Sequence, residues 1–271
     1  AASRALGLPH NDPAAALAAR DKALMRQLLF QGGVPTPWFE RFTTADDPAV
    51  VAARAPYPCV VKPLNLNGSR GVIRADSPAE LVAAIDRLTR LIAPLHPHSP
   101  AAPPPAAYLV EAFIPGFEVA LEGLLDDGQL RVLALFDKPD PLDGPFFEET
   151  IYVTPSRLPG ATQTAIAATT AAAARALGLC AGPVHAELRV NADGAWLVEV
   201  AGRSIGGLCS QVLRFGIDAS LEELILRQAV GLPLGDTGRR DRAAGVMMIP
   251  IPQAGLLRAV EGVEEAAAVP L

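Results

Sequence analysis

One hairpin constrains the fold of this chain more than any other feature. Its two segments, VHAELRV (184–190) and AWLVEVA (195–201), alternate apolar and polar residues and are joined by NADG. A period of two indicates strands that bury one face, and a short loop that ends in glycine favours a hairpin. The chain is therefore expected to contain an antiparallel sheet packed on a hydrophobic core.

The register of this hairpin decides which side chains meet. We expect a three-residue loop over 192–194, which places Glu187 directly opposite Glu199. In this register Trp196 and Val198 share the core face with the apolar residues of the first strand. A two-residue Asp-Gly loop would instead send the two apolar sets to opposite faces, so we prefer the first register.

Two glutamates at one cross-strand position repel each other in the absence of a cation. We therefore expect a raised pKa on one member of the Glu187/Glu199 pair. Mg²⁺ would turn the pair into a binding site, because it takes one or two carboxylates and completes its shell with water and phosphate. The alternative is that both acids are solvated on an open face of the sheet.

Two further patterns bear on charge and metal binding. Arg203, four positions after Glu199, suits the stabilisation of charge on a transferring phosphoryl group, or it pairs with a nearby acid. His96 and His98 form an H-x-H pattern in a Pro-rich stretch, and we interpret them as solvated rather than metal-bound.

The rest of the chain alternates strand and helix signals. Capping boxes at Ser77 and Ser220 open two helices, a helical region runs from Asp12 to Gly33, and another helix is expected over 161–177. Further strands are expected at 59–62, 72–75, 108–114, 117–125 and 130–136. Hairpins that alternate with helices predict an α+β layout of antiparallel sheets with covering helices.

Composition argues against several classes of function. A net charge of −6 argues against broad electrostatic binding to nucleic acid or to an anionic membrane. The cysteines, Cys59, Cys180 and Cys209, lie far apart without a CxxC, so neither a disulfide framework nor a zinc site is indicated, and a reducing cytoplasm is expected. The Ala-rich run 165–182 carries Arg175 and is interpreted as an amphipathic helix rather than a membrane span.

Lysine is scarce in this chain, with three lysines against twenty arginines. The three are Lys22, Lys62 and Lys138. Because arginine serves wherever a generic cation suffices, a retained lysine suggests a position that needs a compact point charge. Lys62 ends an apolar strand and leads into the loop NGSRG (67–71), and a solvated turn alone does not require a lysine there.

The chain contains neither G-x-x-x-x-G-K-[ST] nor G-x-G-x-x-G, which excludes a P-loop protein. Its motifs, taken in order, instead resemble those of the ATP-grasp superfamily, and most of all its L-amino acid ligase and biotin carboxylase-like branch. Each motif is weak alone, and their shared order carries the resemblance. The motifs are RDK (20–22), VVKP (60–63), NGSRG (67–71), VEAFIPGFE (110–118), HAELRV (185–190) and EVAGR (199–203).

This resemblance implies an α+β ATP-grasp fold in which two lobes, each an antiparallel sheet with helices, clamp a nucleotide. The implied domains are a helical entry (1–33), a small lid lobe with the Gly-rich loop (34–107), a large lobe with the metal site (108–235) and the start of a truncated C-terminal region (236–271). We interpret the chain as an excised core without the family's N-terminal α/β domain. A fusion to that domain, a homo-oligomer and the activity of the chain alone are left open.

The resemblance also implies which residues bind the phosphates of ATP. Lys62 would contact the α- and β-phosphates, and Lys22 would be a second contact. A mobile lid would cover the β- and γ-phosphates with its backbone N–H groups, and its residues are Asn67, Gly68, Ser69, Arg70 and Gly71. For Ser69 and Arg70 the alternative is plain loop polarity.

The remaining implied roles concern the nucleoside, the metal and the reacting group. A linker formed by Glu111 and the backbone of Ala112, Phe113 and Ile114 would read adenine, and Glu118 would hold the ribose hydroxyls. Glu187 and Glu199 would bind Mg²⁺, and Arg203 would lie beside an acyl phosphate. Many members carry Asn where this chain has Ala201. Three more residues are expected at the cleft, facing substrate or solvent: Lys138, Glu148 and Glu149.

The implied function is an ATP- and Mg²⁺-dependent carboxylate–amine ligase. A small carboxylate, such as an amino acid, would take the γ-phosphate to form an acyl phosphate, and an amine would then attack the acyl carbon and release phosphate. Positioning and charge neutralisation would supply most of the catalysis. The alternatives are a biotin carboxylase-like carboxylase, in which bicarbonate accepts the phosphate, and a non-catalytic ATP-binding module. We expect no nucleic-acid or membrane partner.

The glycines of the 67–71 loop lead to a testable prediction. In the absence of ligand, the backbone amides of this loop should exchange hydrogen rapidly, because Gly68 and Gly71 leave the backbone free to move. Addition of a nonhydrolysable ATP analogue should slow that exchange, as measured by mass spectrometry. Equal protection with and without nucleotide would show that the loop is not a lid.

Overall fold

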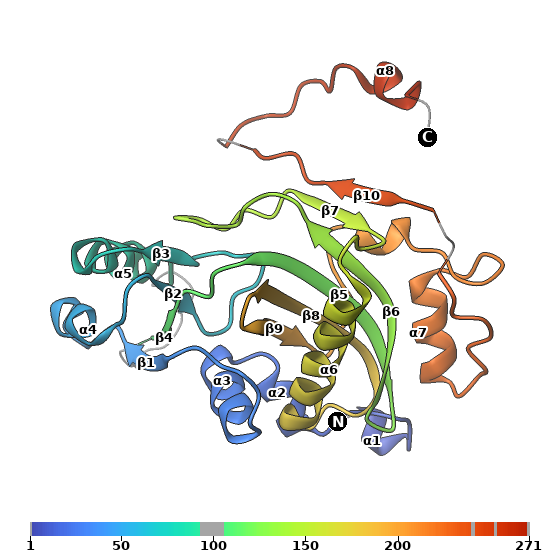
Figure 1. The fold of residues 1–271 in the computed structure, drawn as a ribbon, viewed down its shortest axis with the longest axis horizontal. Helices are drawn as coiled ribbons and strands as arrows, with labels where there is room; N and C mark the ends of the chain where they lie inside the picture. Colours follow the sequence, from blue (N-terminus) through green and yellow to red (C-terminus); the bar gives the residue numbers. More distant parts are fainter. Residues whose placement is uncertain (1, 93–105, 240–241, 252–253, 270–271) are drawn as a thin grey trace.

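Two antiparallel sheets, one of four strands and one of six, organise the chain (Figure 1). The computed structural model describes residues 2–92, 106–239, 242–251 and 254–269. His96 and His98 lie outside these ranges. Within them the predicted α+β layout of antiparallel sheets and covering helices is confirmed.

The smaller sheet has the strand order β1-β4-β2-β3. Helices α4 (Pro48–Arg54) and α5 (Pro78–Ile92) form its hydrophobic core together with the sheet (Figure 1). Helix α5 buries residues at helical spacing, from Leu81 through Ile85 to Leu88, so one face of the helix is apolar. The strands are β1 (Phe39–Thr43), β2 (Cys59–Pro63), β3 (Ile73–Ala75) and β4 (Ala107–Ala112).

Strands β2 and β3 and helix α5 were expected from the sequence, whereas β1 and α4 were not. Strand β1 reads FERFT and α4 reads PAVVAAR. Both segments are short, and their pairing partners lie far away in the sequence: β1 pairs with β4, from Phe39 opposite Glu111 to Thr43 opposite Ala107. Local periodicity cannot report such a partner.

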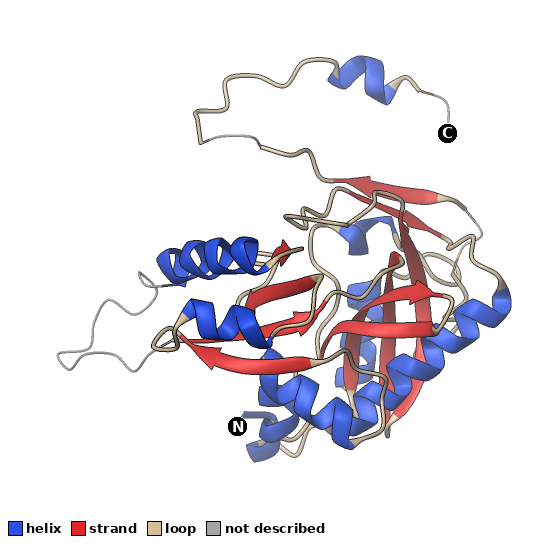
Figure 2. Ribbon diagram, turned by 60° about the vertical axis from the view of Figure 1, so that its left-hand side comes forward, coloured by secondary structure: helices blue, strands red, loops and turns tan. Residues whose placement is uncertain are grey.

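The larger sheet has the strand order β10-β7-β6-β5-β8-β9. One face packs against helix α6 (Gly160–Leu177) (Figure 2). This helix ends at Gly178, which adopts the left-handed conformation with φ 76°. No helix among the described residues has the length and apolarity needed to cross a membrane. The strands are β5 (Phe117–Asp126), β6 (Gln129–Lys138), β7 (Ile151–Thr154), β8 (Gly182–Asn191), β9 (Gly194–Ala201) and β10 (Ala244–Met247).

The other face of the larger sheet carries the short helix η2 (Cys209–Val212) and helix α7 (Leu221–Ala229), which the Ser220 hydroxyl caps by accepting from the Glu223 N–H. After β10 the chain extends away from the sheets towards the short helix α8 (Val263–Ala267) (Figure 1). The other two short helices lie at the start of the chain: α1 (Ala2–Ala5) and α2 (Pro13–Ala18).

The β8–β9 hairpin corrects part of the predicted register. Asn191 pairs with Gly194, so the loop has two residues, Ala192 and Asp193, and the predicted three-residue loop is wrong. Further along, a register shift lies between the Leu188–Leu197 pair and the next one. This shift restores the predicted pairing, because Glu187 does lie opposite Glu199.

The register shift also changes which residues of β9 are buried. Ala195, Leu197 and Val200 belong to the core below α6, whereas Trp196 and Val198 do not. The prediction that Trp196 and Val198 share the core face is therefore wrong. A bulge inserts one residue into a strand and reverses the alternation beyond it, and a strict period of two cannot anticipate that change.

Helix α3 (Lys22–Gln31) joins the two sheets through a fully buried arginine, Arg26. Its guanidinium donates to both carboxylate oxygens of Glu111 on β4, at 2.8 and 3.1 Å. It also donates to the carbonyls of Leu197 and Val198 on β9, at 2.7 and 3.2 Å. One side chain therefore connects a helix, the smaller sheet and the larger sheet.

This arrangement predicts a large loss of stability for Arg26→Met. The substitution leaves the buried Glu111 carboxylate without its main partner, so the free energy of unfolding should fall by about 3–5 kcal/mol. Urea unfolding measures this change. The matched control is Arg175→Met, at an exposed position of α6, which should change stability by no more than about 0.5 kcal/mol. Equal effects of the two substitutions would contradict the structural role of Arg26.

Candidate functional site

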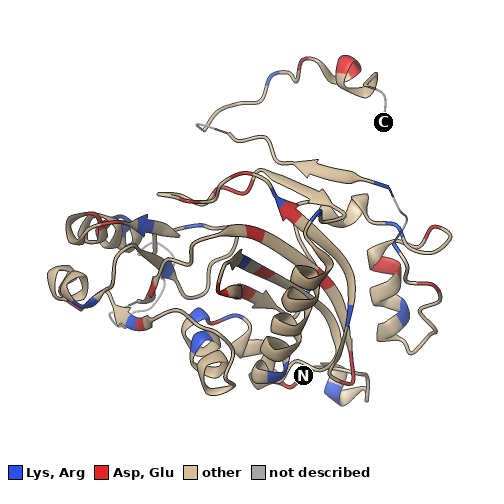
Figure 3. Ribbon diagram, viewed as in Figure 1, with Lys and Arg blue, Asp and Glu red and all other residues tan. Residues whose placement is uncertain are grey.

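A cavity of about 560 Å³ lies where the two sheets meet, and residues of both sheets line it. Figure 3 shows acidic positions on strands of the larger sheet around the middle of the molecule and basic positions on α3 beside them. Three of the predicted site residues, Arg70, Gly71 and Ala112, are not part of the lining. The predicted residues that do line it are Lys22, Lys62, Asn67, Gly68, Ser69, Glu111, Phe113, Ile114, Glu118, Glu187, Glu199 and Arg203.

Two lysines form one wall of the cavity. Lys62 on β2 is buried and forms an ion pair with Glu111 on the neighbouring strand β4. Burial lowers the pKa of Lys62, and the Glu111 carboxylate partly offsets that effect. Lys22, at the start of α3, donates to the Leu66 carbonyl at 2.7 Å and lies 3.5 Å from a carboxylate oxygen of Glu199. Both ammonium groups therefore lie at the meeting point of the sheets.

The loop between β2 and β3 covers the cavity with left-handed backbone. Gly68, Ser69 and Gly71 have φ values of 59°, 51° and 76°. A Cβ atom at Gly71 would lie 2.9 Å from Leu91, so this position accepts only glycine without rearrangement. Within the loop, the backbone hydrogen bonds are from Arg70 to Asn67 and from Val72 to Ser69.

The linker between β4 and β5 is held by its surroundings. The Glu111 carboxylate forms ion pairs with Arg26 and Lys62, and its side chain holds both cations in place. The Ala112 N–H donates to the Trp38 carbonyl and the Phe113 N–H to the Pro58 carbonyl. The Ile114 N–H has no hydrogen-bond partner among the described residues, and this end of the linker faces the cavity.

The polar floor of the cavity follows from the period of two in β5 and β8. Glu118 and Glu122 share one face of β5, while His185, Glu187 and Arg189 share the same face of β8. Glu118 lies opposite Arg189 on one side and opposite Lys138 of β6 on the other. The opposite faces of these strands supply the core below α6.

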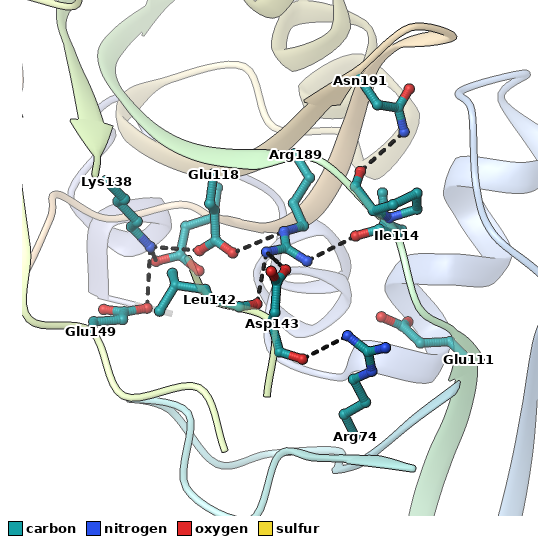
Figure 4. A network of polar contacts seen from close by, with 12 residues as sticks. Arg74, Glu111, Ile114, Glu118, Lys138, Leu142, Asp143, Glu149, Arg189 and Asn191 are labelled. Atoms are coloured by element: carbon teal, nitrogen blue, oxygen red, sulfur yellow. Dashed lines mark hydrogen bonds and ion pairs between the residues drawn. The ribbon is translucent and has the colours of Figure 1, made fainter. Parts of the chain in front are cut away.

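Lys138 is the cation of this floor that the sequence analysis left without a role. Its ammonium lies 2.7 Å from Glu118, 3.1 Å from Glu187 and 3.2 Å from Glu149, and its side chain is 2% exposed. Figure 4 shows Lys138 pointing towards Glu118 and Glu149. One carboxylate oxygen from each of Glu118, Glu149 and Glu187 lies within 4.8 Å of the others.

The pKa of Glu187 moves opposite to the rise that was expected for one member of the Glu187/Glu199 pair. Burial would raise the pKa of Glu187, but Lys138 and the nearby His185 outweigh it and hold the pKa well below its ordinary value. The expected raised pKa therefore does not fall on Glu187. Burial does raise the pKa of Glu118 and of Glu149, and the negative charge of Glu187 adds to both shifts.

A buried histidine on β8 interacts with two glutamates of the cavity floor. His185 is between Glu122 and Glu187, with its Nδ1 atom 3.3 Å from Glu122 and its Nε2 atom 3.6 Å from Glu187. Burial lowers the pKa of His185, but the two carboxylates raise it to about 9. Glu122 is fully buried and accepts from the Ile205 N–H at 3.0 Å. The sequence held a signal for Glu122, because it lies four positions after Glu118 on one strand and so shares its face.

Arg189 links the linker to the loop that follows β6. It donates to the Ile114 carbonyl at 2.9 Å and to the Leu142 carbonyl at 2.7 Å (Figure 4). The guanidinium of Arg189 lies 4.8 Å from the centre of the Phe113 ring, and that of Arg74 on β3 lies 4.3 Å from it. Since Arg74 donates to the next carbonyl of the same loop, at Asp143, both sheets hold this loop.

The donor set fits a magnesium ion. Carboxylate oxygens are the protein ligands that Mg²⁺ prefers, and Glu187 and Glu199 face each other at the cavity with Glu118 and Glu149 close by. Arg203 lines the same cavity and donates to the Ser204 carbonyl. Within the described residues it forms no salt bridge, but its positive charge counteracts the raised pKa of Glu122, so its role at a phosphoryl group stays a prediction beside the alternative of serving a nearby acid.

Comparison with known proteins places these residues in a family context. The family model for the ATP-grasp domain matches residues 55–212. The chain is 28% identical to an alanine–anticapsin ligase of Bacillus amyloliquefaciens over 253 residues, which is 86% of this chain and 52% of that protein. It is 30% identical to a D-alanine–D-alanine ligase of Aromatoleum aromaticum over 178 residues, which is 65% of this chain and 53% of that protein.

A solved structure shows a similar arrangement over nearly the whole chain. The L-amino acid ligase from Bacillus licheniformis superposes with a TM-score of 0.76 at 31% identity, and the match covers 98% of this chain and 62% of that one. The chain spans about half the length of the curated relatives it matches.

The Glu111 network leads to a prediction about pH. Burial would raise the pKa of Glu111, but Arg26 and Lys62 outweigh it and lower the pKa from 4.5 to about 2. A carboxyl whose folded-state pKa is depressed stabilises the fold above its unfolded-state pKa, and this contribution is lost as pH falls through the folded-state pKa. The difference in free energy of unfolding between wild type and Glu111→Gln should therefore be largest above pH 4.5 and shrink towards pH 2.

Urea unfolding at several pH values measures this difference. The matched control is Asp86→Asn on α5, at an exposed position, whose difference from wild type should stay within about 0.5 kcal/mol across the range. If the difference in free energy of unfolding between wild type and Glu111→Gln does not change with pH, the Glu111 carboxylate is not held by its two cations.

Proposed function

Because the chain belongs to the ATP-grasp family, we propose that it is the nucleotide- and metal-binding part of an ATP-dependent carboxylate–amine ligase. The single observation that carries the proposal is the cavity between the sheets. It gathers two lysines, a glycine-rich loop, an opposed glutamate pair and Arg203 around one space. These groups match the needs of phosphoryl transfer, which depends on positioning and on neutralisation of phosphate charge.

The residues of the smaller sheet bind the phosphates in this proposal. Lys62 supplies a point charge that Glu111 holds in place, and Lys22 supplies a second charge from the start of α3. The backbone N–H groups of 67–71 cover the phosphates, since Gly68 and Gly71 allow close approach of the backbone. Adenine binds along the linker, where the Ile114 N–H is free to donate, and Glu118 accepts from the ribose hydroxyls.

The residues of the larger sheet hold the metal and orient the acceptor. Glu187 and Glu199 hold Mg²⁺, which neutralises charge on the phosphates when bound. Arg203 orients the substrate carboxylate, whose oxygen attacks the γ-phosphorus while the bond to ADP breaks. The amine nitrogen then attacks the acyl carbon, the acyl–phosphate bond breaks, and the surplus proton of the amine passes to solvent. The fixed positive charge of Arg203 stabilises the negative charge that develops on the transferring phosphoryl group.

Substrate class and setting are part of the same proposal. The relatives named above are ligases of alanine or of L-amino acids, and this likeness supports an amino acid or a similar small carboxylate as the acceptor. The biotin carboxylase-like alternative has no such support among them. The proposal includes a cytoplasmic setting, the four predicted domain ranges, and either a homo-oligomer or a fusion to an N-terminal domain that helps to form the substrate pocket.

The experiment that tests this function measures ADP formation by the full-length protein across a set of amino acids, alone and in pairs. A ligase should form ADP and phosphate only when both an acid and an amine are present, and mass spectrometry should detect the amide. ADP formation that requires bicarbonate instead would identify a carboxylase. ATP binding without ADP formation under any pairing would leave a binding module.

The proposed phosphate contact of Lys62 predicts the effect of its removal. Lys62→Ala should weaken ATP binding by at least about tenfold, since a cation close to phosphate contributes more than 1 kcal/mol at low dielectric. Calorimetric titration measures the affinity, and circular dichroism checks that the variant is folded. Unchanged ATP affinity and turnover in the folded variant would remove Lys62 from the site.

The proposed metal pair predicts a thermal effect that does not depend on turnover. A ligand that binds only the folded state at 100 times its Kd adds about 2.7 kcal/mol of stability. Mg²⁺ with a nonhydrolysable ATP analogue should therefore raise the melting temperature of wild type. Glu199→Gln should lose most of this increase, because one carboxylate of the pair is gone. The same increase in both proteins would exclude Glu199 as a metal ligand.

A further inference from the structure

The ammonium group of Lys138 occupies the centre of three carboxylates. Glu118, Glu149 and Glu187 approach it to between 2.7 and 3.2 Å, and the lysine side chain is 2% exposed. The three acids come from β5, β8 and the loop before β7, so tertiary packing alone brings them together. Without a cation at their centre, three carboxylates this close, one buried and two half-buried, would repel one another.

Glu187 is shared between this trio and the proposed metal pair. The oxygen that contacts Lys138 is Oε1, which is also the atom nearest to His185. Glu187 Oε1 accepts a hydrogen bond from the Lys138 ammonium at 3.1 Å, and a divalent cation bound to the same carboxylate would repel that ammonium. Lys138 and a divalent cation at Glu187 therefore compete for the same carboxylate.

The fold also offers a place to which Lys138 can move. A second cavity of about 500 Å³ adjoins the first, and Lys138 lines it together with Asp140 and Asp143. Phe113 and Leu142 line both cavities and separate them. The four-carbon stem of lysine is flexible, so its ammonium can leave one carboxylate of the trio without a change in the backbone.

We propose that Lys138 is a resident cation that neutralises Glu118, Glu149 and Glu187 in the metal-free protein and leaves Glu187 when a divalent cation binds there. The proposal rests on the proposed role of Glu187 as a metal ligand. Lys138 thereby keeps the floor of the cavity assembled before the ligand arrives. It also lowers the affinity for metal alone, since each binding event must displace an ion pair.

The first test measures Mn²⁺ binding without nucleotide, by electron paramagnetic resonance of the free ion. Lys138→Met should bind Mn²⁺ at least about tenfold more tightly than wild type, because a competing positive charge close to the ion is gone. A structural role alone predicts the opposite, since loss of the lysine would disorder the acids. Equal or weaker binding by folded Lys138→Met overturns the proposal.

A matched variant separates competition from a general effect of charge. Arg54→Met also removes one positive charge, but Arg54 pairs with Glu40 outside the cavity, so this variant should not tighten Mn²⁺ binding. Tightening in Arg54→Met equal to that in Lys138→Met would indicate a change in net charge only and overturns the proposal.

The second test uses the wild-type chain and holds even where Lys138→Met does not fold. The chain has three lysines, so selective ¹⁵N labelling of lysine gives three side-chain resonances. On addition of Mg²⁺ alone, the Lys138 resonance should shift with saturation, and that of Lys62 should stay unchanged. A Lys138 resonance that does not move while Mg²⁺ raises the melting temperature overturns the proposal. Neither measurement involves ATP or turnover, so the ligase proposal can fail independently.

Discussion

The rest of the structure depends on the buried ion network of Arg26, Glu111 and Lys62. Arg26 binds Glu111 through two hydrogen bonds and at the same time caps two carbonyls of β9, so it fixes the smaller sheet against the larger one. Glu111 also forms an ion pair with Lys62. A buried charge must be paired. Here the ion pairs of Glu111 connect the two sheets and hold Lys62 at the cavity between them.

The same principle recurs around the cavity. Each of the three lysines is buried against at least one glutamate: Lys62 against Glu111, Lys22 against Glu199, and Lys138 against Glu118 and its two neighbours. Lysine is a strongly hydrated point charge that can leave one partner for another, unlike the rigid fork of arginine. The arginines of the site, Arg26 and Arg189, instead hold backbone carbonyls in fixed positions. In the proposed function Lys22, Lys62 and Arg203 meet the ligand, whereas Arg26 and Arg189 hold the fold.

The site could be predicted where its chemistry lies within a short stretch of sequence. Glu187 faces Glu199 as expected, because a hairpin carries its own pairing partners within a few residues. The loop count and the burial of Trp196 and Val198 were wrong, because a bulge depends on how the hairpin packs against α6 and leaves no mark in the alternation. Arg26, Glu122 and His185 were missed as well. Their side chains become meaningful only when strands and helices distant in sequence bury them together.

The sequence by itself determined the periodicities of the strands and helices and the glycines that allow left-handed backbone in the 67–71 loop. The scarcity of lysine also drew attention to Lys138. These features are local, and short-range sterics or residue choice decides them. Only the tertiary structure decided which charges meet. It placed Lys138 among three carboxylates from separate elements and so lowered the pKa of Glu187, where like-charge repulsion alone predicted a rise for one of the pair. Electrostatic energies depend on distance through space and on burial, and neither quantity is a property of the neighbouring residues in the chain.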